Sequence, residues 1–151
     1  MTLPETPGEG HTTLASVCLS EYEATIDGQA QDFGLEISLT YSGAFGGAME
    51  VISDAVLLCL GRDEIYPGAV LPDIVAHGPL RHLFFIVPEL WDGGLVSLEV
   101  GDREVRYLQA IGITDEEMAV VGTEGADALV TLLNGSEADL FDWSRRSVAT
   151  L

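Results

Sequence analysis

The fold of this chain is decided by residues 81–148, which read RHLFFIVPELWDGGLVSLEVGDREVRYLQAIGITDEEMAVVGTEGADALVTLLNGSEADLFDWSRRSV. Two apolar runs, Leu83–Val87 and Leu95–Val100, predict strands. Gly101-Asp102 favours a tight hairpin into a third strand, Glu104–Ile113. Because this third strand is apolar on much of both faces, we expect it to lie in the centre of a sheet.

The same stretch then changes from strand to helix. Thr114 is placed to cap the amide of Glu117, and Glu117 can reach back, which is the capping box of a helix start. A further helix is predicted at about Glu124–Leu133, because its apolar residues share one side and Asn134-Gly135 follows.

Upstream, Phe33–Tyr41 alternates apolar and polar residues, which predicts a half-buried strand. Apolar residues at three- and four-residue steps predict a helix over about residues 45–60. Short edge strands are expected within Ala69–Ala76, interrupted by Pro72. The fold class is therefore α+β, a single domain with a mixed or antiparallel sheet and about three helices. The predicted core includes Leu39, Ile52, Leu57, Phe85, Leu108 and Leu129.

The length of 151 residues suits one domain. Residues 1–12, rich in Pro, Gly and Glu, are expected to form a mobile tail before a domain at 13–151. Cys18 and Cys59 lie in apolar runs and are expected to be buried free thiols. We expect a cytoplasmic location, because there is no disulfide framework, no secretory signal pattern and no apolar run long enough for a membrane span.

The charge of the chain is its unusual property. There are 25 acidic residues against six arginines and no lysine, a formal net charge of −19. A nucleic-acid surface needs clustered cations, and anionic membranes are disfavoured for the same reason. The negative field favours a basic protein partner. The alternative is that the acidity serves solubility alone.

No pattern of catalytic or metal-binding residues is present. Asp115, Glu116 and Glu117 are explained by a helix start, where anions are stabilised. His11, His77 and His82 lack ligand spacing and are expected at the surface or at strand edges. No serine lies in a GxSxG turn. We therefore expect no catalytic residue, no cofactor and no metal, and predict that the protein is not an enzyme.

One loop holds a candidate for protein binding. Trp91 lies between two predicted strands, with Glu89 and Asp92 beside it. An exposed tryptophan can anchor an interface, with charged residues at its rim. A lone loop tryptophan more often folds back over the core, so binding through these three residues is a hypothesis.

Six segments between residues 33 and 148 also follow a familiar order. Each resembles a known pattern: Phe33–Tyr41 resembles GxELTLR; residues 45–60 with Tyr66–Leu71 resemble LxxLARYV…F…G; His82–Phe85 resembles LLF; Tyr107–Glu117 resembles xLQxxPITxxE; Gly125–Leu129 resembles GxxALLxxL; and Asp142–Val148 resembles DxxRxSV. In these features the chain resembles bacterial suppressor-of-fused domain proteins. It departs from the pattern at Tyr41, where a basic residue is common, and at Gly112, where proline is usual.

The resemblance implies a mixed α+β fold and a protein-binding role without chemistry. Animal members of that family sequester a transcription factor by gripping a peptide strand, and bacterial members resemble immunity proteins that neutralise polymorphic toxins. The matched motifs resemble fold determinants, so no binding residue is carried over. Three functions remain open: an immunity-type protein against a toxin domain, a regulatory module that sequesters another cytosolic protein, and a small enzyme of unknown type.

Overall fold

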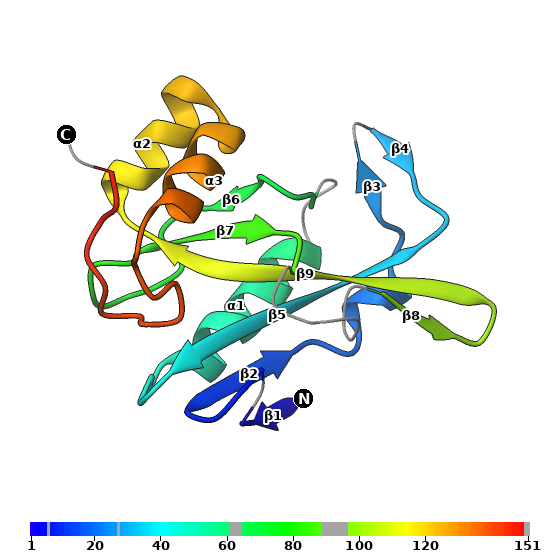
Figure 1. Cartoon of the computed structure of the whole chain (residues 1–151). Coiled ribbons are helices and arrows are strands. Elements are labelled where there is room, and N and C mark those ends of the chain that lie inside the picture. Colours follow the sequence, from blue (N-terminus) through cyan, green and yellow to red (C-terminus); the bar gives the residue numbers. More distant parts are fainter. Residues whose placement is uncertain (6, 27, 61–64, 89–96, 150–151) are drawn as a thin grey trace.

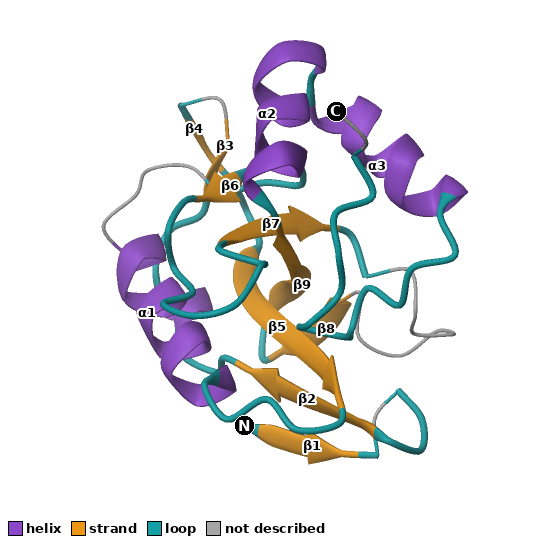
Figure 2. Cartoon of the chain, turned by 90° about the vertical axis from the view of Figure 1, so that its left-hand side faces the viewer, coloured by secondary structure: helices purple, strands orange, loops and turns teal. Residues whose placement is uncertain are grey.

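Three helices cover the two faces of one sheet (Figure 2). The computed structural model describes residues 1–5, 7–26, 28–60, 65–88 and 97–149. Helix α1 (Ala48–Leu60) lies on one face, and α2 (Asp115–Glu124) and α3 (Ala126–Gly135) lie together on the other. The α+β prediction with about three helices is confirmed.

The sheet has seven strands in the order β1-β2-β5-β9-β7-β6, with β8 also paired to β9. Their bounds are β1 Thr2–Pro4, β2 His11–Ala15, β5 Gly34–Ser42, β6 Val70–Leu71, β7 His82–Ile86, β8 Ser97–Val100 and β9 Arg103–Ile113. The β5–β9 pair is parallel and the other described pairs are antiparallel, so the sheet is mixed (Figure 1). A short 3-10 helix, η1 (Leu19–Glu21), and a separate hairpin of β3 (Thr25–Ile26) and β4 (Gln29–Ala30) precede β5.

Strand β9 is central, as its two apolar faces predict. It pairs with β5 on one side and with β7 and β8 on the other. Its residues Tyr107–Ile113 are all buried. Adjacent residues of β7 alternate between layers: Phe84 packs towards α2 and α3, and Phe85 packs in the cluster that includes α1. The sheet therefore carries a hydrophobic core on each face.

Five of the six predicted core residues are buried, and the prediction for Leu57 is wrong. Leu57 exposes 66% of its surface, whereas Ile52 in the same helix exposes 6%. Helix α1 turns Val51, Ile52, Ala55 and Cys59 to the sheet. At 100° per residue, position 57 lies on the opposite side. The apolar run Val56–Leu60 extends round the helix and so hides this orientation in the sequence.

Strand β5 is buried on both faces rather than half-buried. Its polar residues Glu36, Ser38 and Thr40 are each 2% exposed. They stay buried because they are hydrogen-bonded: the Thr40 hydroxyl meets the Thr13 hydroxyl at 2.7 Å and accepts from Gln109 Nε2 at 3.1 Å. The alternation in the sequence is real, but the spacing does not show that Glu36, Ser38 and Thr40 have hydrogen-bond partners that let this second face be buried.

Two expectations for the first 20 residues differ from the structure. Within the expected tail of residues 1–12, Thr2–Pro4 forms β1, which pairs with β2, and the terminal ammonium donates to the Ala15 carbonyl at 2.7 Å. Cys18 is exposed, because it lies in the turn before η1 rather than in a strand; Cys59 is buried as expected.

Candidate functional site

The strongest electrostatic feature of the described chain is a buried ion pair between α2 and the C-terminal segment. Arg145 donates from Nη1 and Nη2 to the two carboxylate oxygens of Glu117, at 2.7 and 2.9 Å. Glu117 is fully buried and Arg145 is 6% exposed. The Arg145 fork also donates to the Gly112 and Arg146 carbonyls. We call this pair with its partners the Glu117 clasp.

The clasp includes the predicted capping box. The Thr114 amide donates to Glu117 Oε2 at 3.0 Å, and the Glu117 amide donates to the Thr114 hydroxyl at 3.3 Å. The Thr114 hydroxyl donates in turn to the Ser147 hydroxyl, and the Val148 amide donates to Glu117 Oε1 at 2.8 Å. The ITxxE and DxxRxSV segments are therefore the two halves of one structural unit.

The charge state of Glu117 follows from these contacts. Burial alone raises its pKa, but the hydrogen bonds from Arg145, Val148 and Thr114 and the Arg145 charge outweigh burial. The net pKa of Glu117 lies below its ordinary value, so the carboxylate is ionised. An ionised, fully paired carboxylate is a structural group rather than a general acid.

Gly112 fits the same unit by its size. A Cβ at this position would lie 2.9 Å from Leu80 and 3.0 Å from the Trp143 ring. Trp143 stacks on Phe45 at 4.4 Å between ring centroids and donates from Nε1 to the Thr40 carbonyl. Glycine at 112 thus allows the aromatic side chain to close over the end of the sheet.

A second buried carboxylate, Glu36 on β5, holds η1 against the sheet. It accepts from the Ser16 hydroxyl, from the Leu19 amide, and from the amide and hydroxyl of Ser20. Gly34, two residues earlier, leaves room for Ser20: a Cβ there would lie 2.6 Å from the Ser20 Cβ. The GxE segment is therefore also a fold determinant.

His82 corrects the expectation of surface or strand-edge histidines, since it is only 4% exposed. The Asp73 amide donates to His82 Nδ1 at 2.9 Å, so this nitrogen accepts and the proton lies on Nε2. Nε2 faces Asp115 Oδ1 at 2.8 Å. The His82 ring therefore connects the loop before β7 to the start of α2. Asp115, predicted only as an anion at the helix start, also contacts this ring.

Sequence reasoning missed the roles of Glu36, His82 and Arg145. Glu36 lies in the GxELTLR-like segment and Arg145 in the DxxRxSV-like segment, so the family-like motifs held a signal for both. Their partners, Ser16, Ser20 and Glu117, lie 16 to 28 residues away in the chain and could not be assigned from spacing. His82 had no comparable signal.

The described residues show no cluster of side chains with the makeup of a metal site. In the ranges that the structure describes, no three His, Cys, Asp or Glu side chains are grouped as metal ligands. A groove of about 410 Å³ between β3, β5, β8 and β9 carries two charged residues, Glu104 and Arg106. They pair at 3.0 Å, and the Arg106 hydrogen bond lowers the pKa of Glu104. No helix among the described residues has the length and apolar character to cross a membrane.

The arginines do little to offset the negative surface. Of the five within the described ranges, Arg81 and Arg106 pair with Asp73 and Glu104, and Arg145 pairs with Glu117. Arg103 donates to the carbonyls of Ser20, Tyr22 and Phe33. Most carboxylates on the described surface have no ion-pair partner. The predicted binding residues Glu89, Trp91 and Asp92 lie outside the described residues.

Comparison with known proteins agrees with this arrangement. The sequence model of the suppressor of fused protein family matches residues 1–146. The chain belongs to the suppressor of fused family. A curated relative, Immunity protein YqcF of Bacillus subtilis, is 25% identical over 153 residues, covering 98% of this chain and 80% of YqcF.

Solved structures show the same fold. A suppressor-of-fused homologue from Neisseria gonorrhoeae superposes with a TM-score of 0.74 at 16% identity, over 95% of this chain and 73% of that one. Drosophila Suppressor of Fused gives a TM-score of 0.70 at 13% identity, over 91% of this chain and 39% of that one. A chain of a Sufu–Fu complex gives 0.66 at 13% identity, over 91% of this chain and 70% of that one.

Proposed function

We propose that this suppressor-of-fused family protein is an immunity-type protein that binds and neutralises a toxin domain. The observation that carries the proposal is the match to YqcF, a protein named for immunity, along 98% of this chain. A match of that extent includes the segments that carry Glu36 and Glu117, so the similarity extends over the whole fold and is not limited to one part of it.

The site chemistry supports neutralisation by binding rather than by catalysis. The two buried carboxylates, Glu36 and Glu117, are occupied by hydrogen bonds that hold η1 and the C-terminal segment. A catalytic acid needs a raised pKa in a cleft, and that of Glu117 is lowered. We therefore propose that the protein acts without chemistry, through its surface.

The charge supports a basic partner. A net charge of −19 with no lysine attracts cationic surfaces and repels nucleic acid. Complementary potentials speed the encounter of two proteins, which suits a protein that must reach a toxin before the toxin reaches its target.

Co-expression with a candidate toxin domain, sought among the products of the neighbouring genes, tests the proposal. We expect growth of a host that the toxin domain otherwise kills, and co-elution of the two purified proteins as a stable complex. Protection without a complex would contradict neutralisation by binding. A complex without protection would favour the alternative function, a regulatory module that sequesters its partner.

A further inference from the structure

We propose that the basic partner docks on the outer face of α1. The surface is an apolar stripe, which we call the α1 ridge, made of Met49, Leu57 and Leu60 together with Tyr22 just after η1. This inference rests on the proposed function and names the surface through which it acts.

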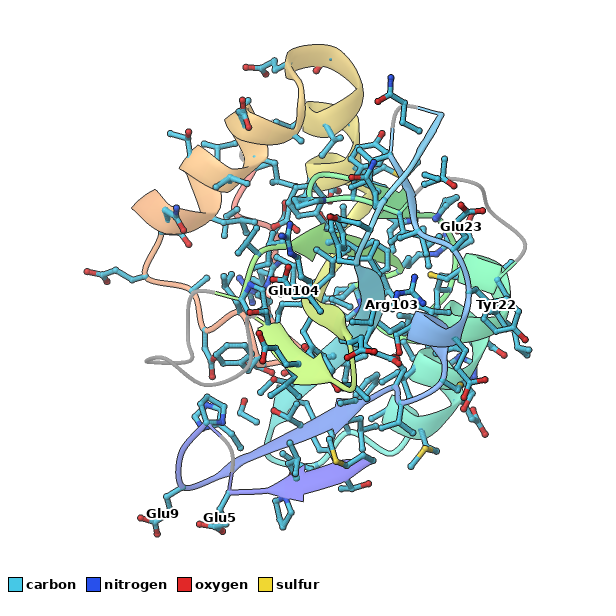
Figure 3. The ribbon with its side chains drawn as sticks, turned by 90° about the vertical axis from the view of Figure 1, so that its right-hand side faces the viewer. Glu5, Glu9, Tyr22, Glu23, Arg103 and Glu104 are labelled. Carbon is cyan, nitrogen blue, oxygen red and sulfur yellow. The ribbon has the colours of Figure 1, made fainter. Side chains whose placement is uncertain are left out.

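The ridge consists of large apolar side chains that are exposed on the outer side of α1 and next to it. Met49, Leu57 and Leu60 expose 58%, 66% and 39% of their surfaces, and Tyr22 exposes 58%. In a helix of 3.6 residues per turn, positions 49, 57 and 60 lie towards one side, away from the sheet-facing residues. Leu60 and Tyr22 line the same small hollow of about 60 Å³, so the helix stripe continues onto Tyr22. Figure 3 shows Tyr22 pointing outward beside α1.

The backbone beneath Tyr22 is held in place. Arg103 Nη1 donates to the Ser20 carbonyl at 2.6 Å, and its Nη2 lies 3.4 Å from the Tyr22 carbonyl. The Tyr22 amide donates to the Leu19 carbonyl, and Glu36 holds Ser20 from below. An anchor fixed before binding loses less conformational entropy on docking, so Tyr22 is suited to be one.

Carboxylates border the ridge on two sides. Glu50 and Asp54 are exposed on α1, and Glu21 and Glu23 are exposed on either side of Tyr22. Within the described part of the chain, none of these four has an ion-pair partner. An apolar centre inside a charged rim is the usual anatomy of a protein interface.

The negative charge of these carboxylates indicates which kind of partner can bind the ridge. In a symmetric dimer the same patch meets itself, so a second copy would bring like carboxylates together. A partner with arginine or lysine around an apolar contact would instead pair with the rim while covering the ridge. The ridge therefore fits a basic protein better than another copy of this chain.

The test uses an inactivated form of the toxin domain against which the protein protects in co-expression, and measures its Kd for variants of the full chain. We expect Leu57→Glu to weaken binding by about 30-fold or more, the loss typical of a central anchor. The matched control is Leu132→Glu, the same change at a 42% exposed leucine of α3 on the other layer, which should leave Kd unchanged. Tyr22→Ala gives a second, independent truncation of the ridge.

Charge variants test the rim separately. Glu50→Gln with Asp54→Asn should slow association by roughly tenfold while changing dissociation less. Glu124→Gln with Asp127→Asn removes the same charge from α2 and α3 and should have a smaller effect, since both residues lie exposed on the other layer. Unchanged melting temperatures for all variants establish that the fold is intact.

The outcomes separate the surface from the function. If wild type binds and protects, and Leu57→Glu and Tyr22→Ala bind as tightly, the ridge is not the docking surface although the function stands. If wild type itself does not bind the domain, the proposed function fails and the ridge proposal fails with it. A wild-type dimer that Leu57→Glu converts to a monomer would show a self-interface and overturn the basic partner.

Discussion

At the scale of single residues, the Glu117 clasp connects the start of α2 to the C-terminal segment. Its energetic weight comes from burial: breaking a buried ion pair leaves an uncompensated charge, which costs about 3–5 kcal/mol. Exposed pairs contribute about 0–1 kcal/mol. The same chemistry thus has different consequences at Arg145, which is buried, and at Arg81, whose side chain is 50% exposed.

Arg145→Met should lower the free energy of unfolding by about 3–5 kcal/mol, because it strands the Glu117 carboxylate. Arg81→Met, which removes the exposed pair with Asp73, should cost no more than about 1 kcal/mol. Urea denaturation measures both. Equal losses in the two variants would mean that the clasp does not stabilise the fold as its burial indicates.

The depressed pKa of Glu117 predicts a pH dependence with a definite sign. Between the folded and unfolded pKa values the unfolded chain binds more protons, so the free energy of unfolding rises with pH there. The contribution is complete above the unfolded pKa and is lost as pH falls through the folded one. Glu117→Gln should therefore differ from wild type most near neutral pH, and the difference should shrink in acid.

Urea midpoints for wild type and Glu117→Gln, measured at a series of pH values, follow this convergence. A constant gap between the two proteins down to the acid limit of folding would contradict the assignment, because it would show that protonation of Glu117 does not remove the contribution.

At the scale of elements, η1 lies so close to β5 that Gly34 leaves no space for a side chain. Gly34→Ala should destabilise the protein by about 1–3 kcal/mol, because its Cβ would lie 2.6 Å from Ser20. Gly122→Ala is the matched control: its added Cβ meets nothing within 4 Å in α2, so it should stabilise by about 0.4–1 kcal/mol. Thermal melts distinguish the two, and a stabilised Gly34→Ala variant would refute the close contact.

A leucine-to-alanine substitution should have different effects on stability in the central strand β9 and on the exposed face of α1. Leu108→Ala should cost about 2–5 kcal/mol, because Leu108 on β9 is 4% exposed. Leu57→Ala should cost little, because its side chain is exposed and alanine favours the helix. Chemical denaturation of the two variants compares these positions directly, and an unchanged stability for Leu108→Ala would count against the central position of β9.

Local patterns predicted the elements better than their environment. The capping box at Thr114 and the two apolar faces of β9 depend on neighbouring residues, so the sequence was sufficient for both. The orientation of Leu57 and the burial of Glu36 depend on which neighbours cover each face, which spacing does not reveal. β1 was missed for a similar reason, since its three residues are strand only through pairing with β2.

At the scale of the whole molecule, the negative charge is the property most closely connected with the proposed function. The negative charge was evident from composition. Arg81, Arg103 and Arg106 bind groups of this chain, so most surface carboxylates are not neutralised and the electrostatic field around the protein is negative. The partner and its docking surface could not be read from composition, because net charge has a sign but no location. The predicted loop residue Trp91 stays a hypothesis beside the α1 ridge.

The most direct measurement of the proposed function is the kinetics of binding to the toxin domain at increasing ionic strength. With a Debye length of about 8 Å at physiological salt, steering by surface charge is strongly screened. We predict that the association rate constant falls by at least about tenfold between about 50 and about 500 mM salt, while the dissociation rate constant changes less. An association rate indifferent to salt, or a partner that is itself acidic, would contradict electrostatic capture of a basic toxin.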